Sequence, residues 1–197
     1  MPQSSKSSRV GRPRSEKSKT AILDAAWKLL KTTTLRDLSV EAIARESGVG
    51  KTTIYRWWSS KVAVAMDAFV EKVLVITPFP EDVPAMDAIT QQMAALSQAF
   101  SGDYGRIVAQ IIAEGQAEPE VLANYRSHFL LQRREAAKQI IHKGIESGEF
   151  DPSLDPDLAI DLLYGAIYFR LLVGHLPLDQ QFIEELSQLA SKVLKIT

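Results

Sequence analysis

Apolar residues recur every three or four positions along most of the chain, and this is the period of an amphipathic helix. The first such run begins at Thr20, a candidate N-cap, and ends at the three β-branched residues Thr32–Thr34. Residues 1–19 show no apolar period and indicate a flexible basic arm. No segment alternates polar and apolar residues for long enough to predict a strand.

Three further helices are predicted before the first cluster of prolines. One covers Val40–Ser47, with Ser39 as its N-cap and Gly48 as the left-handed residue that follows it. The next covers about 51–58. The fourth covers about 60–75, and the serine at its start can act as its cap.

Pro78, Pro80 and Pro84 mark the best candidate for a domain boundary. Beyond them, breaks at glycine and proline separate five more predicted helices, which cover about 85–100, 103–116, 119–147, 156–174 and 179–195. The pattern therefore predicts an all-α fold of about nine helices. After the arm it divides into an N-terminal domain over 20–77 and a C-terminal helical domain over 84–197.

Charge is distributed unevenly along the 197-residue chain, although the formal net charge is only −1. Residues 1–60 hold 12 Lys and Arg against 5 Asp and Glu, whereas residues 61–197 hold 11 against 19. A basic N-terminal third on an acidic remainder indicates a module that binds a polyanion such as nucleic acid.

The absence of cysteine excludes disulfide scaffolds, thiolate metal sites and cysteine nucleophiles, and it fits a reducing compartment. The N-terminus lacks the apolar core of a secretory signal. The most apolar stretch, 158–172, is interrupted by Asp161 and Arg170 and is too short to span a membrane. These features predict a soluble cytoplasmic protein without a membrane partner.

The predicted helices 40–47 and 51–58 are joined by a tight turn over 48–50 that contains two glycines, and such a pair is typical of a helix-turn-helix. In the second helix Ile54 and Trp58 are four residues apart, so both are expected to face the core. The opposite face carries hydroxyl, aromatic and basic side chains suited to base edges and phosphates, namely Lys51, Thr52, Thr53, Tyr55 and Arg56. An ordinary solvated helix is the alternative interpretation.

The stretch Thr20–Phe69, with AILDAAWKLL followed by LSVEAIARESGVGKTTIYRWWSSKVAV, resembles the DNA-binding domain of the TetR (tetracycline repressor) family of bacterial regulators. The preceding GRPR is similar to the basic arm common before that domain. Such an arm can reach phosphates or a minor groove through Arg12 and Arg14.

The resemblance also implies roles by position. Ser39 and Lys61 would contact phosphates at the N-termini of two helices, where backbone amides favour anions. Thr52 and Thr53 would face bases. Three side chains would lie at the DNA backbone or nearby, namely Tyr55, Arg56 and Trp57.

Three positions depart from the family pattern. Gly50 stands where the family usually has a serine cap, Ser59 replaces a common proline, and residues 34–35 replace a usual glycine-aromatic pair. Because none of these positions supplies a DNA-contacting side chain, we expect them to affect local stability more than function.

Other chemistries receive less support. Residues 48–53 imitate the end of a phosphate-binding P-loop, but Arg45 stands where that motif needs glycine. His128, His142 and His175 form no i, i+4 pair, and no Gly-x-Ser-x-Gly elbow is present. We therefore expect no metal ion, cofactor or catalytic site. A small helical enzyme or ligand carrier is the alternative from another class.

The helix predicted over 156–174 is apolar nearly all round and must be covered on more than one side. The next predicted helix carries an apolar seam, and these two helices from each of two copies would form a four-helix interface. Its predicted residues are Gly165, Phe169, Phe182, Leu186, Leu189 and Val193. The alternative is that both are ordinary core helices. The resemblance, which over 133–178 extends to one subgroup of the family, also implies a homodimer on a near-palindromic operator in double-stranded DNA.

The resemblance further implies a pocket for a small-molecule effector in the C-terminal domain. Its candidate lining residues are aromatic, with plain core packing as the alternative for each: Phe100, Tyr104, Tyr125, Phe129, Tyr164 and Tyr168. We therefore interpret the chain as a ligand-responsive repressor in which the fourth helix connects the two domains. An activator or a ligand-independent regulator is the alternative within DNA binding.

Overall fold

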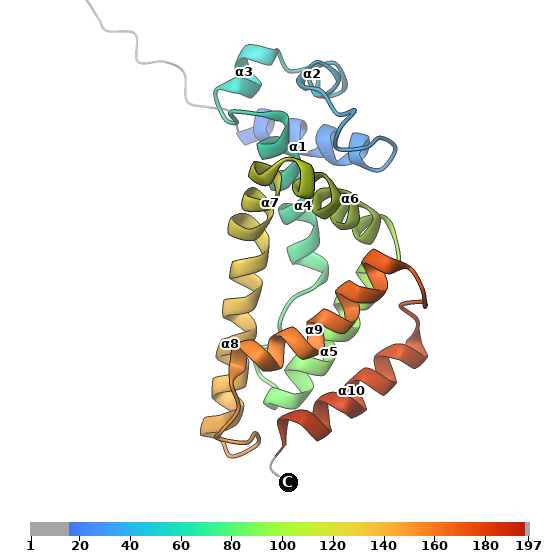
Figure 1. Ribbon diagram of the computed structural model, residues 1–197. Coiled ribbons are helices and arrows are strands. Elements are labelled where there is room, and N and C mark those ends of the chain that lie inside the picture. Colours follow the sequence, from blue (N-terminus) through green and yellow to red (C-terminus); the bar gives the residue numbers. More distant parts are fainter. Residues whose placement is uncertain (1–15, 196–197) are drawn as a thin grey trace, which may run out of the picture.

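The computed structural model describes residues 16–195, and every regular element in this part of the chain is helical (Figure 1). The N-terminal third forms α1 (Glu16–Leu30), α2 (Val40–Ser47), α3 (Lys51–Tyr55) and α4 (Lys61–Ile76). The remainder forms α5 (Ala85–Phe100), α6 (Asp103–Ala117), α7 (Pro119–Tyr125), the π-helical turn η1 (Arg126–Leu130), α8 (Leu131–Glu146), α9 (Pro156–Val173) and α10 (Gln180–Leu194). Because α7, η1 and α8 follow one another without a break, residues 16–195 contain nine helical rods, and the predicted all-α fold is confirmed. No helix in these residues is long and apolar enough to cross a membrane.

The start of the first helix differs from the prediction. α1 begins at Glu16 rather than at Thr20, whose hydroxyl donates to the Glu16 carbonyl oxygen at 3.2 Å inside the helix. Glu16 lies in the positively charged first turn, where a carboxylate is favourable. Residues 16–19 therefore extend the helix instead of belonging to the predicted arm. Arg12 and Arg14, which were predicted to contact DNA, lie outside the described residues.

Helix α4 connects the N-terminal helices to the C-terminal ones (Figure 1). It packs against α1 and also against α5, α7 and η1. Its apolar side chains are buried accordingly, among them Val64, Met66, Phe69 and Val73. The two groups of helices thus share one helix as part of both cores.

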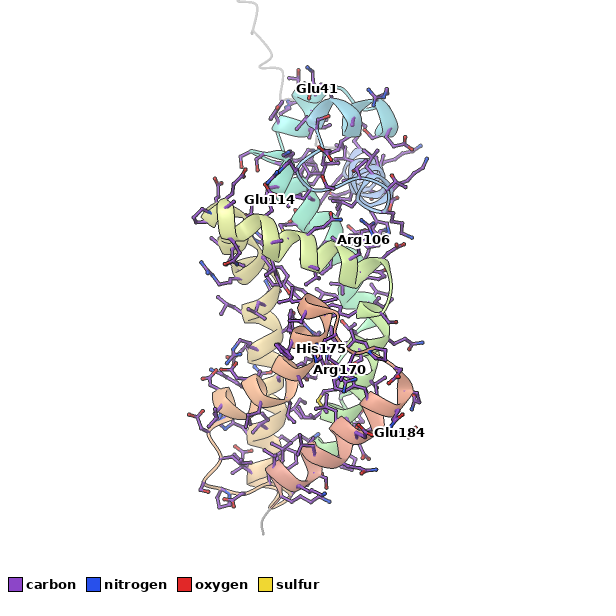
Figure 2. All side chains as sticks on the ribbon, turned by 45° about the vertical axis from the view of Figure 1, so that its right-hand side comes forward. Glu41, Arg106, Glu114, Arg170, His175 and Glu184 are labelled. Atoms are coloured by element: carbon purple, nitrogen blue, oxygen red, sulfur yellow. The ribbon has the colours of Figure 1, made fainter. Side chains whose placement is uncertain are left out.

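Helix α6 makes a second connection between the two groups. Arg106 donates to the carbonyl oxygens of Leu30 and Lys31, at 2.8 and 2.6 Å, and so caps the end of α1. At the other end of α6, Glu114 pairs with Arg36 at 3.3 Å. Figure 2 shows Arg106 and Glu114 spaced along α6, below the N-terminal helices.

The loop between α8 and α9 closes the far end of the C-terminal helices. The Glu149 carboxylate accepts hydrogen bonds from the amides of Ala85 and Met86, at 2.9 Å each, and thereby caps α5. Phe150 is fully buried, and its ring lies directly against the backbone of Gly144 in α8. A residue without a side chain is therefore needed at this point of α8.

Gly144→Ala is expected to destabilise the fold by about 1–3 kcal/mol, because an added Cβ would lie 2.3 Å from the Phe150 ring in a packed core. Phe150→Leu should relieve part of this overlap, so the double variant should lose less stability than the sum of the two single losses. Urea unfolding of the four proteins measures the coupling. Additive losses would show that the ring and Gly144 do not constrain each other.

Candidate functional site

The first helix of the predicted pair begins and ends as the sequence indicates. Ser39 Oγ accepts a hydrogen bond from a first-turn amide of α2 at 3.1 Å, and Gly48 adopts φ 68° after its last residue. Gly50 begins α3 without a side-chain cap. A salt bridge of 3.0 Å between Lys51 Nζ and Glu41 instead connects the start of α3 to α2, and this hydrogen-bonded contact lowers the pKa of Glu41.

Helix α3 has a buried face and an exposed face, as predicted. Ile54 and Trp58 are buried, and Trp58 Nε1 donates to Asp67 of α4 at 2.7 Å. The side chains predicted to contact DNA are accessible to different degrees: Lys51, Thr52, Tyr55 and Arg56 are exposed, whereas Thr53 and Trp57 are half-buried. The helix ends at Tyr55, earlier than the predicted Trp58, because the amides of residues 57 and 58 both bond to the Ile54 carbonyl in a closing turn.

Ser60 and Lys61 lie at the N-terminus of α4. Ser60 Oγ accepts a hydrogen bond from a first-turn amide at 3.2 Å, so it caps the helix as predicted. Lys61 is half-buried, and its Nζ donates to the Arg36 carbonyl oxygen in the loop before α2. This bond holds the ammonium group beside the helix N-terminus, and an ammonium has three donors, so donors remain for an anion.

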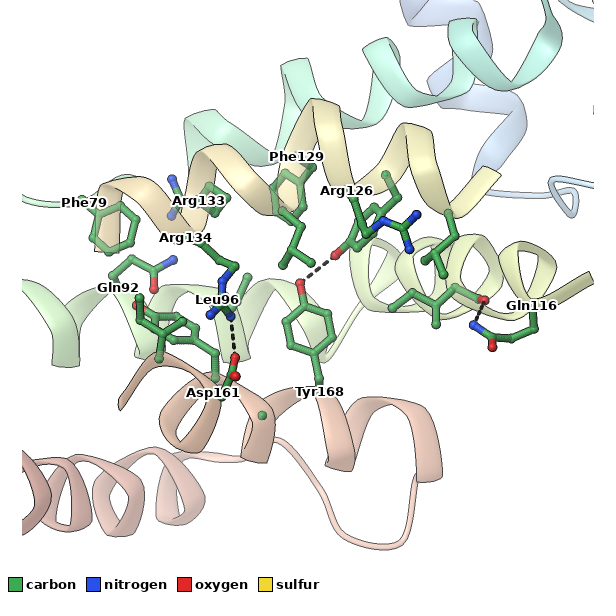
Figure 3. A pocket seen from close by; sticks show the side chains of 17 residues that line it. Phe79, Gln92, Leu96, Gln116, Arg126, Phe129, Arg133, Arg134, Asp161 and Tyr168 are labelled. Atoms are coloured by element: carbon green, nitrogen blue, oxygen red, sulfur yellow. Dashed lines mark hydrogen bonds and ion pairs between the residues drawn. The ribbon is translucent and has the colours of Figure 1, made fainter. Parts of the chain in front are cut away.

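A cavity of about 370 Å³ lies among the C-terminal helices (Figure 3). Residues of α5, α6, the rod formed by α7, η1 and α8, and α9 supply its walls. Four of the six aromatic candidates line it, namely Tyr125, Phe129, Tyr164 and Tyr168. The volume lies in the lower part of the range for ligand pockets, roughly 300–1,000 Å³.

Phe100 and Tyr104 do not line this cavity, contrary to the prediction. Phe100 is buried and meets the Tyr168 ring edge-on, with centroids 5.4 Å apart. Tyr104 packs its ring 4.7 Å from that of Trp27 in α1, where α6 meets the N-terminal helices. Aromatic character predicted that these rings would be covered, but it did not specify which neighbours would cover them.

Polar side chains that the sequence reasoning missed also line the cavity, namely Gln92, Gln116, Arg126, Arg133, Arg134 and Asp161. Gln92 is only 1% exposed and follows Ile89 and precedes Leu96 on the buried face of α5. A glutamine at a core position of an amphipathic helix is the sequence signal that would have identified it.

Three buried tyrosine hydroxyls belong to the cavity wall. Those of Tyr125 and Tyr168 share a hydrogen bond of 2.6 Å. Burial raises the pKa of Tyr168 to about 12, although this hydrogen bond and the charge of Arg133 act in the opposite direction. Burial likewise raises the pKa of Tyr164, whose Oη has no hydrogen-bond partner among the described residues.

Arg133 is a half-buried charge at the cavity. Its guanidinium lies over the Phe79 ring, 4.4 Å from the centroid, and donates to the carbonyl oxygen of Thr77 at the end of α4. Burial lowers the pKa of Arg133, and within residues 16–195 no carboxylate pairs with it. The neighbouring Arg134, in contrast, bridges Asp157 and Asp161.

Helix α9 and the loop after it present an apolar stripe whose members are 47–59% exposed: Leu158, Leu162, Phe169, Leu172, Val173 and Leu176. Gly165 lies within it and has open space at its Cβ position. Leu189 of α10 is also exposed, and Val193 is half-buried.

Two predicted interface residues are placed differently. Phe182 and Leu186 are 6% and 4% exposed, because the face of α10 that carries them packs within the chain, where α10 contacts α5 and α9. They belong to the chain's own core, and their assignment to a dimer interface was wrong.

Two protein families match separate parts of the chain. Residues 22–67 match the bacterial regulatory proteins of the tetR family, and residues 86–190 match the tetracyclin repressor-like C-terminal domain. YdeS of Bacillus subtilis (strain 168), an uncharacterized HTH-type transcriptional regulator, is 34% identical over 190 residues, which is 96% of both chains.

Solved structures share the fold. The TetR family transcription regulator SCO0332 has a TM-score of 0.78 and 31% identity, over 89% of this chain and 97% of that one. FadR from Bacillus subtilis, solved in complex with stearoyl-CoA, has a TM-score of 0.62 and 20% identity, over 87% and 97% of the two chains. The second likeness is one of fold alone.

The buried tyrosines make stability sensitive to alkaline pH. The unfolded chain loses a tyrosine proton near pH 10, whereas folded Tyr168 keeps its proton up to about pH 12. The contribution of this tyrosine to the free energy of unfolding is therefore fully present below pH 10. It falls between pH 10 and 12, by up to about 1.4 kcal/mol per pH unit for one such group. In Tyr168→Phe this decline, measured by urea unfolding at several pH values, should be less steep. An unchanged slope would contradict the assignment.

Proposed function

This chain belongs to the TetR family of bacterial regulatory proteins and is a DNA-binding transcriptional regulator, and we propose that it acts as a ligand-responsive repressor. In this proposal a homodimer binds a palindromic operator, and an effector in the cavity releases it. The observation that carries the proposal is that one helix, α4, contacts both the helix-turn-helix and the cavity wall. The division into an arm (1–19), a DNA-binding domain (20–77) and a ligand-binding and dimerisation domain (84–197) stays a prediction, with 16–19 moved into α1.

Two side-chain contacts join α4 to the N-terminal helices. The Trp58–Asp67 hydrogen bond joins its N-terminal half to the turn after α3, and a salt bridge of 2.7 Å between Lys72 and Asp24 joins its C-terminal half to α1. In this proposal these contacts pass a displacement of α4 to the recognition helix.

The C-terminal half of α4 lies against the cavity. The Phe69 ring packs 5.2 Å from Phe129 and 6.5 Å from Tyr125, and both of these rings line the cavity. A ligand that binds more tightly to a conformation with a shifted α4 favours that conformation, by an amount bounded by its differential affinity. FadR, which has this fold, was solved with stearoyl-CoA, so the fold accommodates a small molecule in at least one case.

We assign the exposed face of α3 to the major groove. Thr52 and Thr53 contact base edges, and Tyr55 and Arg56 contact the DNA backbone or bases, with Trp57 at the margin. Lys51 shares its ammonium group between Glu41 and a phosphate. Ser39 and Lys61, at the N-termini of α2 and α4, hold phosphates together with the free backbone amides there.

We assign the exposed stripe of α9, with Gly165 and Leu189, to the dimer interface. Contiguous exposed apolar side chains of this kind mark an interaction surface, and a glycine permits close approach of two helices. A two-fold dimer places its recognition helices about 34–36 Å apart, which demands a near-palindromic operator.

Selection of bound duplexes from a random DNA pool should return a palindrome whose affinity falls steeply with salt. On that duplex, Ser39→Asp should weaken binding by at least about tenfold, because it places a carboxylate beside a phosphate. Aspartate also caps helices, so Ser39→Asp should keep the stability of the protein, whereas Ser39→Ala should lose about 0.5–2 kcal/mol. Filter binding and thermal unfolding measure the two effects separately.

Undiminished affinity in Ser39→Asp would remove Ser39 from the DNA interface, and no enriched duplex at either of two salt concentrations would contradict operator binding altogether. A reporter driven from the selected operator separates the two regulatory directions. Expression of the protein lowers output for a repressor and raises it for an activator.

Phe169→Glu is expected to dissociate the dimer, because it buries an unpaired charge in an apolar interface. Sedimentation of the purified protein measures the change. Leu131→Glu is the matched control, since Leu131 is 57% exposed but lies on α8, outside the stripe. Dimers that persist in Phe169→Glu, or dissociation that occurs equally in Leu131→Glu, would contradict the assigned interface.

A further inference from the structure

One end of the cavity holds polar groups that the protein does not satisfy. Figure 3 shows Phe79, Gln92 and Arg133 at this end, with Arg126 and Gln116 at the other. Gln92 is 1% exposed, yet its Oε1 has no hydrogen-bond partner among the described residues. Buried polar atoms are nearly always hydrogen-bonded in folded proteins, so this end of the cavity is suited to a polar group from outside the chain.

The Tyr164 hydroxyl is a second polar group of the cavity that the protein does not satisfy. Its Oη is also buried without a partner among the residues from 16 to 195. Tyr164 and Arg133 line the same cavity, and the charge of Arg133 lowers the pKa of Tyr164 against the larger opposing effect of burial. A free hydroxyl donor and a guanidinium in one cavity favour an anionic acceptor.

Among the charged side chains that line the cavity, the positive ones outnumber the negative ones. Arg126, Arg133, Arg134 and Asp161 line it. Arg134 forms salt bridges with both Asp161 and the nearby Asp157. No carboxylate in the described part of the chain pairs with Arg126 or Arg133. A guanidinium has five N–H donors, and the Arg133 guanidinium makes one hydrogen bond to the protein, to the Thr77 carbonyl. The cavity therefore carries an excess of positive charge with unused donors.

The remaining wall is suited to an apolar body of limited size. Aliphatic side chains from five elements line the space, namely Leu96, Ile112, Leu122, Leu130 and Ile160. A volume of about 370 Å³ holds on the order of a dozen water-sized groups at about 30 Å³ each.

We propose that the effector is an amphipathic organic anion of about this size, of the class of medium-chain carboxylic acids, whose anionic head pairs with Arg133 and accepts a hydrogen bond from Tyr164. The inference rests on the proposed function, because it names the class of effector for the same cavity. A neutral ligand leaves Arg133 desolvated without a counter-charge, and a cation is repelled by the excess positive charge.

The proposed pairing also connects the ligand to α4. The Thr77 carbonyl, at the end of α4, and the proposed anion bond to the same guanidinium through different N–H groups. A charged acceptor forms a stronger hydrogen bond than a neutral carbonyl. An anion that draws the guanidinium toward itself therefore alters the bond at the C-terminal end of α4, so in this proposal Arg133 both recognises the head group and connects it to α4.

Sodium decanoate, 1-decanol and decylamine each have ten carbons and differ in the charge of the head group. Isothermal titration calorimetry of the full chain with each probe, below the concentration at which that probe aggregates or separates from solution, measures the preference of the cavity. We expect decanoate to bind at least about tenfold more tightly than either of the others. Equal binding of decanoate and 1-decanol, tighter binding of decylamine, or no binding of any probe overturns the proposal.

Variants test whether Arg133 is the anchor. Arg133→Gln should reduce the preference for decanoate to less than about threefold, and Arg133→Lys should retain most of it. Lys143→Gln removes a positive charge from the same helix outside the cavity and should leave the preference unchanged. If Arg133→Gln does not fold, Tyr164→Phe provides a second measure and should weaken decanoate binding relative to 1-decanol. If folded Arg133→Gln, or Tyr164→Phe, still prefers decanoate over 1-decanol as strongly as the unchanged protein does, the assignment of that residue to the anionic head group is wrong.

Operator affinity with and without decanoate separates this proposal from the proposed function. Decanoate that binds preferentially but leaves operator affinity unchanged would contradict the ligand-responsive repressor while supporting the ligand class. Release of the operator by 1-decanol and not by decanoate would overturn the ligand class while supporting a ligand-responsive repressor.

Discussion

Helix α4 buries most of its apolar residues between Val64 and Val73, because both α1 and the C-terminal elements α5, α7 and η1 pack against it. Full burial of a side chain such as Phe69 stabilises a fold by about 1.5–3 kcal/mol, and α4 contributes several such residues. Since both groups of helices depend on the same buried helix, neither can repack without displacing the other. In the proposed mechanism this shared burial carries a change at the Phe129 and Tyr125 rings, which pack against Phe69, to the helix-turn-helix.

Hydrogen bonds to helix ends fix how the helices around this shared core are oriented. Arg106 caps the end of α1, Arg133 holds the end of α4, and Glu149 caps the start of α5. Each donor or acceptor comes from a distant part of the chain, so these contacts fix the angle between elements rather than stabilise one helix. The salt bridges at the surface, such as Lys51–Glu41, stay open to solvent and add little to stability.

Much of this organisation follows from local patterns in the sequence. The capped start of α2 at Ser39, the left-handed Gly48, the buried Ile54 and Trp58, and the breaks between the C-terminal helices were all predicted, because caps and apolar periods act within one or two helical turns. The start of α1 was placed four residues too late, since a run of polar residues carries no apolar period even when it continues a helix.

The sequence by itself determined that the chain is all-helical, that it carries a helix-turn-helix of the TetR type, and that several aromatic residues of its C-terminal part lie at core-like positions. Only the tertiary structure decided which aromatic rings enclose the cavity, since Phe100 and Tyr104 pack elsewhere, and which apolar positions stay exposed, since Phe182 and Leu186 are covered by the chain itself. It also decided that Arg133 lacks a carboxylate while Arg134 has two. Such outcomes depend on which helices meet and at what angle, and contacts between residues far apart in sequence leave no local period from which they can be predicted.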